Sequence, residues 1–83
     1  MKLVYFASVR EAIGLSSEDR DIPYGARTVG DFVVWLRGQS QGHAVALDDL
    51  SHLRFALDQN MVTADALLVD GEELAIFPPV TGG

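Results

Sequence analysis

The sequence predicts an α+β fold in which one main helix packs on a mixed β-sheet. Three observations indicate this class: strand-like apolar runs lie near both ends of the chain, an amphipathic helical pattern lies between them, and turn residues separate the segments. With 48% hydrophobic residues among 83, the chain can form one small core but is too short for two. We therefore expect a single domain over residues 1–83.

The first strand is expected from Lys2 to Val9, a run rich in β-branched and aromatic residues. Leu3 and Tyr5 would lie on one face, and Val4 and Phe6 on the other. Because both faces are apolar, the strand should be covered on both sides and lie centrally in the sheet.

A short helical turn follows in the segment VREAIG. Glu11 comes three residues after Ser8, so Ser8 is the expected cap, and Gly14 can end the turn. A second strand should run from about Ser17 to Ile22, where the loop 23–25, Pro-Tyr-Gly, ends it.

The main helix should begin at Val29, because Thr28 and Asp31 have the spacing of a capping box. Apolar residues then recur at helical spacing as one stripe that must cover the sheet, namely Val29, Phe32, Val33 and Leu36. Gly38 to Gly42 should end this helix. The segment 43–51 suggests no more than an irregular helix.

A β-hairpin is predicted where LRFAL, residues 53–57, is followed by the polar turn DQN and by Met61 and Val62. Phe55 and Leu57 are expected in the core. Asp70 and Gly71 indicate a further turn.

The last strand should cover residues 74–77 and end at Pro78 and Pro79, since proline cannot donate to a strand ladder. This order of strands around one helix fits the β-grasp architecture. In that architecture the first and last strands lie side by side at the centre, so the segment after residue 77 would leave from one end of the sheet.

Charge and composition exclude several classes of function. The net charge is −6 and the six basic residues are scattered, which argues against a nucleic-acid partner. The absence of cysteine excludes disulfides, a thiolate nucleophile and thiolate metal sites. The run MKLVYFASV is too short for a signal peptide or a membrane span, so we expect a cytoplasmic protein without a membrane partner. We also expect no metal and no stably bound cofactor.

Side chains that could ligate a metal or act as a base are few. His43 and His52 lack an acidic neighbour at ligand spacing, so we interpret them as surface histidines. Glu72 and Glu73, with Asp70, resemble a carboxylate cluster but are better explained as a solvated turn and the start of a strand.

The last seven residues, FPPVTGG, offer a carboxyl group on a slender tail. Glycine lacks a Cβ, so the tail can enter a channel too narrow for other residues. Residues 78–83 would span on the order of 20 Å when extended, and the prolines restrict the root of the tail. A pair of terminal glycines also arises by chance in about one chain in 200, so the pair alone is compatible with an inert end.

Four segments together carry a family pattern: YFASVREAIG, FALDQNMV, DGEELAIF and FPPVTGG. With them the chain resembles, over nearly its whole length, the small subunits of molybdopterin synthase, the MoaD family of ubiquitin-like sulfur carriers. The resemblance implies a ubiquitin-like β-grasp with a free carboxyl-terminal tail. It also implies a sulfur-carrying subunit that is not an enzyme by itself.

The resemblance implies that Gly83 is the reactive residue and that Gly82, which has no side chain, keeps the tail narrow enough to enter a partner. An E1-like adenylating enzyme would use ATP to convert the Gly83 carboxylate into a transient acyl-adenylate. A sulfur donor such as a cysteine desulfurase system would then supply the sulfur of a thiocarboxylate. Within a heterotetramer, the molybdopterin synthase large subunit would pass this sulfur to cyclic pyranopterin monophosphate and form the dithiolene needed for molybdenum cofactor biosynthesis.

Residues that would bind these partners follow from the positions that match the family. They are Phe6, Met61 and Phe77 as apolar contacts, Arg10 as an ion-pair partner, and the tail residues Pro78, Pro79, Val80 and Thr81. Each of the apolar three could instead belong to the core. Asp58 stands where the family often has asparagine, so its side chain can accept a hydrogen bond in a turn but cannot donate one.

Other functions remain open on the sequence alone. A sulfur carrier of the thiamine pathway shares the fold and the two glycines. A ubiquitin-like modifier would join Gly83 to a lysine through an amide bond. A binding domain with an inert tail would need neither glycine.

Overall fold

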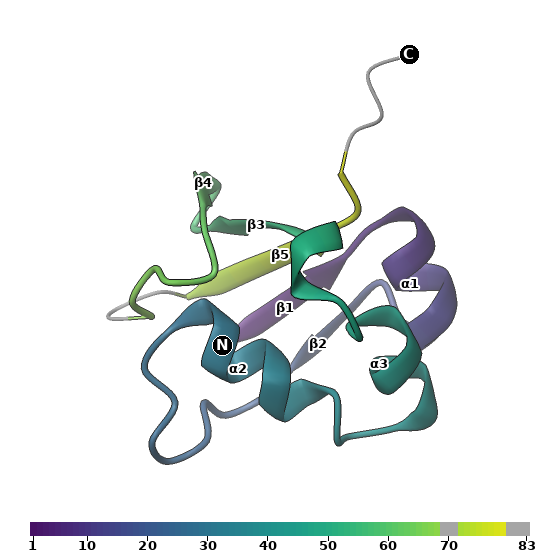
Figure 1. Ribbon diagram of the computed structural model, residues 1–83, viewed down its shortest axis with the longest axis horizontal. Coiled ribbons are helices and arrows are strands. Elements are labelled where there is room, and N and C mark those ends of the chain that lie inside the picture. Colours follow the sequence, from purple (N-terminus) through teal and green to yellow (C-terminus); the bar gives the residue numbers. More distant parts are fainter. Residues whose placement is uncertain (69–71, 80–83) are drawn as a thin grey trace.

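A computed structural model describes residues 1–68 and 72–79, which form a five-stranded mixed sheet with helices on one face (Figure 1). In chain order the elements are β1 (Lys2–Tyr5), α1 (Ala7–Ile13), β2 (Ser17–Asp19), α2 (Val29–Leu36), α3 (Gln41–Ala46), the 3₁₀ turn η1 (Leu50–His52), β3 (Arg54–Leu57), β4 (Asn60–Val62) and β5 (Glu73–Phe77). The strand order is β2-β1-β5-β3-β4. β1 and β5 are parallel neighbours, so the predicted α+β class and β-grasp are confirmed.

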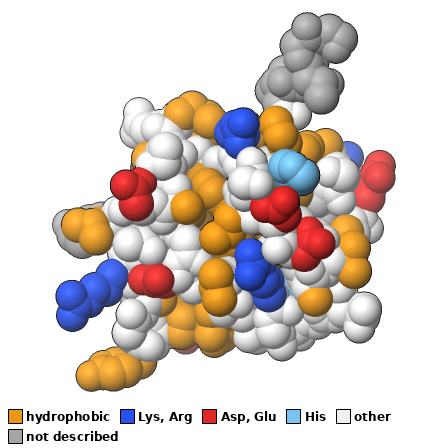
Figure 2. Space-filling view, in the orientation of Figure 1, with side chains coloured by type: hydrophobic (Ala, Val, Ile, Leu, Met, Phe, Trp, Pro, Cys, Tyr) orange, Lys and Arg blue, Asp and Glu red, His pale blue; other side chains and the backbone are white. Residues whose placement is uncertain are grey.

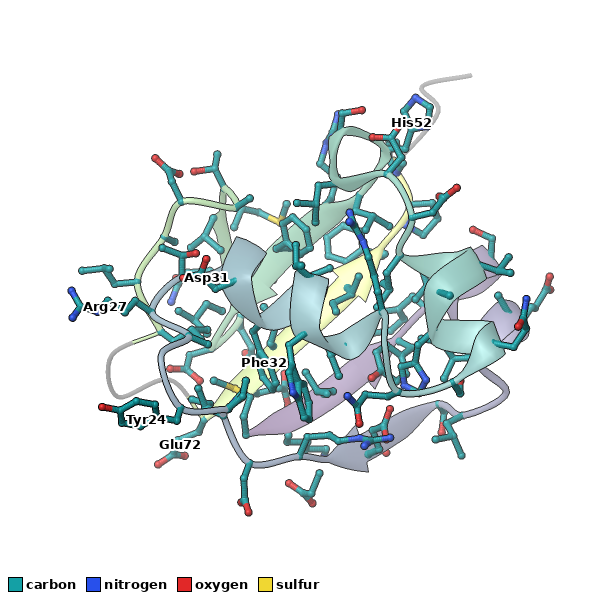
Figure 3. All side chains as sticks on the ribbon, turned by 60° about the horizontal axis from the view of Figure 1, so that its bottom comes forward. Tyr24, Arg27, Asp31, Phe32, His52 and Glu72 are labelled. Carbon is teal, nitrogen blue, oxygen red and sulfur yellow. The ribbon has the colours of Figure 1, made fainter. Side chains whose placement is uncertain are left out.

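The core lies between α2 and one face of the sheet. The predicted stripe of α2 is fully buried, and Figure 3 shows Phe32 on the side of the helix that faces the strands. The sheet contributes Leu3, Tyr5, Phe55, Leu74 and Ile76 from β1, β3 and β5. The capping box is confirmed: the Thr28 hydroxyl accepts from the Asp31 backbone N–H, and the Asp31 carboxylate accepts from the Thr28 backbone N–H.

The first strand is shorter than predicted. The Phe6 backbone N–H donates to the Ile76 carbonyl, and Ala7 then turns the chain away from the sheet with a φ of 50°. The helix begins there, so Ser8 lies inside α1 and the prediction that it caps the turn was wrong. The predicted end at Gly14 is confirmed, because this glycine has a φ of 88° and its N–H donates to the Arg10 carbonyl.

β2 also ends early, at Asp19 rather than Ile22. Lys2 pairs with Asp19, and beyond this pair only the hydrogen bonds between Arg20 and Met1 join the two segments. The expectation that β1 would be covered on both faces was wrong as well. On the face without helices, Val4 of β1 is only partly buried, and Phe6, which directly follows the strand, is 47% exposed.

The main helix ends just before Gly38, in agreement with the predicted stop over Gly38 to Gly42, but Gly42 itself lies in the next helix. α2 ends at Leu36, and Ser40 caps the next helix, α3, by accepting from the His43 backbone N–H. Gly42 lies inside α3 where it packs on α1: a Cβ at this position would lie 2.4 Å from the Ala12 carbonyl oxygen. The segment predicted as an irregular helix therefore contains the end of α3 and the turn η1.

The predicted hairpin is confirmed as β3 and β4, joined by a two-residue turn. Asp58 and Gln59 form this turn, with φ values of 48° and 70°. The Asp58 Oδ1 accepts from the backbone N–H groups of Glu72 and Glu73 at 2.9 and 3.0 Å. These bonds require only an acceptor from the side chain at position 58, so aspartate in place of asparagine leaves the turn intact. The turn predicted at Asp70 and Gly71 lies outside the described residues.

A polar network fastens the short edge strand β2 to the helices. At its centre, the Glu18 carboxylate accepts from the Tyr5 hydroxyl at 2.7 Å and from Arg20 Nε at 2.9 Å. It also lies 2.7 Å from His43 Nε2, while the other ring nitrogen of His43 lies 2.7 Å from the Ser40 hydroxyl. We call Tyr5, Glu18, Arg20, Ser40 and His43 the Glu18 network.

Hydrogen bonding in the Glu18 network changes two pKa values in opposite directions. Burial raises the pKa of Glu18, but hydrogen bonds from Tyr5, His43 and Arg20 outweigh it and hold this pKa below its ordinary value. Burial, together with the bond to the Glu18 carboxylate, raises the pKa of the Tyr5 hydroxyl. The network therefore stabilises Glu18 as a carboxylate and Tyr5 as a neutral donor.

The Gly42→Ala substitution should reduce the free energy of unfolding by about 1–3 kcal/mol, because the new methyl group overlaps the Ala12 carbonyl. Alanine favours the helix over glycine by about 1 kcal/mol, so a net loss in the free energy of unfolding must come from the clash. Urea unfolding measures the difference. Gly38→Ala is the matched control, since its Cβ would meet its nearest atom at 3.6 Å. Equal stabilities of the two variants would contradict the close packing of α1 and α3.

The Glu18→Gln substitution should lower the free energy of unfolding at pH 7 by about 1–3 kcal/mol. Because the folded-state pKa of Glu18 is lowered, its carboxylate stabilises the fold above the unfolded-state pKa, and this contribution disappears as the pH falls through the folded-state pKa. The gap between wild type and variant should therefore close in acid. Unfolding curves over a pH series test this, with the exposed Glu11→Gln as control. A gap that stays constant with pH would count against the network.

Candidate functional site

The root of the tail lies at the end of β5, the central strand. β5 ends at Phe77, and Pro78 and Pro79 follow, as predicted from their missing N–H groups. The hydrogen bond from the Phe6 N–H to the Ile76 carbonyl, at 3.2 Å, holds this end of β5 against the start of α1. Four predicted tail residues lie outside the described residues, namely Val80, Thr81, Gly82 and Gly83.

Two aromatic rings stand beside this root. Phe6 and Phe77 meet edge to face, with ring centroids 6.2 Å apart and planes at 87°. Phe6 is exposed and Phe77 is half-buried, so neither ring belongs to the buried core cluster. The two rings form an apolar surface beside the tail root, and their mutual contact partly fixes its shape.

The face of the sheet away from the helices, which we call the open face, extends from these rings to the edge strand β4. Across it, strand register aligns Val4, Ala75, Ala56 and Met61 in one row. The two alanines are small, so the middle of the row is low, and Met61 at its edge is 63% exposed. The prediction that Phe6, Phe77 and Met61 are interface contacts is thus compatible with their positions on one surface.

Sequence reasoning missed the alanines that form the floor of the open face. The signal was present, because Ala56 and Ala75 alternate along their strands with the core residues Phe55 and Ile76; Ala56 is half-buried and Ala75 is 8% exposed. Arg54 was missed too. It pairs with Phe77 in the register of β3 and β5, and its Nη1 donates to the Leu53 carbonyl at 2.9 Å.

The opposite face, seen in Figure 2, is chemically mixed, with acidic and basic side chains among the hydrophobic ones. Tyr24 is fully exposed in the loop before α2, and Figure 3 shows it standing out at the edge of the molecule. Arg10 lies exposed on α1, and its pairing with a partner stays a prediction.

The histidines differ from each other. His52 is exposed on η1, with Nδ1 3.3 Å from Asp49 Oδ2, which confirms a surface histidine. The same interpretation was wrong for His43, which is 3% exposed. Its ring can be buried because both ring nitrogens have hydrogen-bond partners in the Glu18 network. Glu73 begins β5 and Glu72 is exposed, as expected, whereas Asp70 lies outside the described residues.

In the part of the chain that the structure describes, no three histidine, aspartate or glutamate side chains gather as metal ligands. Across residues 1–68 and 72–79, no helix combines the length and the apolar character needed to cross a bilayer.

Known proteins match the chain over its full length. It is 40% identical to the molybdopterin synthase sulfur carrier subunit of Escherichia coli over 85 residues, covering 100% of this chain and 99% of that protein. It is 30% identical to the protein of the same name from Homo sapiens over 86 residues, covering 100% and 93% of the two chains.

Solved structures share the fold. A putative molybdopterin converting factor subunit 1 from Pyrococcus furiosus superimposes with a TM-score of 0.72 at 29% identity, covering 95% of each chain. SAMP1 from Haloferax volcanii gives a TM-score of 0.69 at 28% identity, covering 100% of this chain and 98% of that one. The family model described as the ThiS family matches residues 3–83. This chain belongs to the ThiS family.

Proposed function

We infer that the chain is the sulfur carrier subunit of molybdopterin synthase, and that Gly83 carries the sulfur. The structural observation that supports this most is the place of the tail root. The central strand ends at Phe77 beside the exposed Phe6 ring, and the open face that begins there carries the exposed Met61 on its edge strand. A carrier needs this combination: a rigid surface that a partner can bind, and a slender tail that reaches beyond it.

The proposed chemistry begins at the carboxylate of Gly83. A carboxylate is a poor electrophile because its oxygen is a poor leaving group. In an E1-like adenylating enzyme, the carboxylate attacks ATP and forms an acyl-adenylate, with loss of pyrophosphate. Sulfide then displaces AMP and leaves a thiocarboxylate; where the donor is the persulfide of a cysteine desulfurase system, the persulfide displaces AMP and a thiol reductant cleaves the S–S bond of the resulting acyl disulfide. Its anionic sulfur is a strong nucleophile, so the carrier needs no cysteine of its own.

The proposed acceptor is cyclic pyranopterin monophosphate, held by the catalytic large subunit. A dithiolene contains two sulfur atoms and each tail delivers one, so two loaded carriers act for each product. This stoichiometry agrees with a heterotetramer of two small and two large subunits. We assign these steps to the cytoplasm, where ATP is available to the activating enzyme.

We propose that both partners dock on the open face. Phe6 and Phe77 lie at the tail root, and Met61 lies across the low alanine floor from them. Aromatic side chains beside a low apolar floor are typical anchors of protein interfaces. Arg10, exposed on α1, would pair with an acidic group at the rim, and Gly82 would let the tail pass through a narrow channel.

Gly83→Ala, or one residue added after Gly83, should abolish sulfur transfer without unfolding the domain, because either change displaces or crowds the reacting carboxylate. The measurement is the intact mass of the chain after incubation with ATP, a sulfide source and an activating enzyme from the same organism. The wild-type chain should exchange one oxygen for sulfur, and tandem mass spectrometry should map the exchange to Gly83. Gly38→Ala controls for a glycine change remote from the tail.

The mass measurement, together with an assay of cyclic pyranopterin monophosphate conversion by the large subunit, distinguishes the alternative functions. A ubiquitin-like modifier would form an amide between Gly83 and a lysine. A carrier of the thiamine pathway would gain the thiocarboxylate but would not convert cyclic pyranopterin monophosphate with the large subunit. An unchanged mass with every activating enzyme, while the fold is intact, would leave a binding domain with an inert tail.

Phe77→Ala should weaken binding of the large subunit by roughly ten- to hundred-fold, as expected for an interface anchor, while the domain stays folded. Titration calorimetry gives the affinity, and circular dichroism reports the fold. Tyr24→Ala is the matched control, because Tyr24 is a fully exposed aromatic residue in the loop before α2. An affinity that Phe77→Ala leaves unaltered would remove Phe77 from the docking surface.

A further inference from the structure

The chain carries its sulfur in only two side chains, since it has two methionines and no cysteine. Met1 is partly buried and packs against the core cluster. Met61 is 63% exposed on β4 and lies outside that cluster. An oxidant in solution would therefore reach the Met61 thioether first.

The surroundings of Met61 leave its thioether open on the sheet side. Its register partner on β3 is Ala56, whose methyl group covers little of it. A shallow groove beside it is lined by Arg54, Met61, Val62, Thr63 and Ala66. The Arg54 guanidinium in this groove already donates through Nη1 to the Leu53 carbonyl.

We propose that Met61 is a peroxide-sensitive modification site whose oxidation releases the carrier from the large subunit. This inference rests on the proposed docking at the open face. In the reaction, hydrogen peroxide transfers one oxygen atom to the Met61 sulfur. The O–O bond breaks, an S–O bond forms and water leaves, so that the sulfur is oxidised by two electrons and the peroxide is reduced.

A sulfoxide at this position changes the interface without disturbing the core. The S–O group is a strong hydrogen-bond acceptor, and burying it in an apolar contact without a donor costs binding free energy. Because Met61 lies outside the core cluster, the oxidised domain stays folded.

The test uses the full-length chain in its carboxylate form, so that peroxide cannot react with a thiocarboxylate. The carrier is treated with hydrogen peroxide, the peroxide is removed, and binding to the untreated large subunit is then measured. We expect a gain of one oxygen atom mapped to Met61, and binding weakened by roughly ten- to hundred-fold. A methionine sulfoxide reductase should restore the affinity.

Met61→Leu is the matched variant, because leucine keeps an apolar side chain of similar volume and has no sulfur. It should bind before and after peroxide with the same affinity, even where Met1 is oxidised. Equal binding by oxidised and untreated wild type would overturn the inference, as would oxidation of Met1 ahead of Met61 or an equal loss of binding in oxidised Met61→Leu. Failure of the untreated wild type to bind is distinguishable from these results, and it would overturn the docking proposal and the inference together.

Discussion

The parallel pairing of β1 with β5 is the constraint on which the rest of the structure depends. Parallel strands cannot be joined by a tight turn, so the intervening chain must cross over, and here it supplies the helices and the β3–β4 hairpin. The pairing buries Leu3 and Tyr5 beside Leu74 and Ile76. It also fixes the direction of β5, so the tail leaves beside the start of α1.

The two faces of the sheet have separate roles because side chains alternate along each strand. One face is covered by the helices and holds the core. The other face has two alanines at its centre and larger apolar side chains at its ends, and it lies beside the tail root. A partner on this face would meet the root of the tail at the end of β5 without disturbing the core.

The Glu18 network compensates for a short edge strand. β2 has three residues and makes few ladder bonds, yet it must cover one side of β1. Its central carboxylate joins the sheet to α3 through His43, whose own contact to Ser40 lies at the helix cap. Polar groups buried in this way stabilise a structure only when all are satisfied, and the described residues contain no buried side-chain nitrogen or oxygen without a partner.

The sequence by itself determined the features that depend on neighbours along the chain. These are the capping box and apolar stripe of α2, the hairpin turn after Leu57 and the end of β5 before Pro78. Tertiary structure decided what depends on segments far apart in the sequence. β1 ends at Tyr5 because Ala7 turns the chain toward α1, Gly42 is required by the contact with Ala12, and His43 is buried because Glu18 lies opposite it. Such features depend on register and on distances between elements, which local periodicity does not encode.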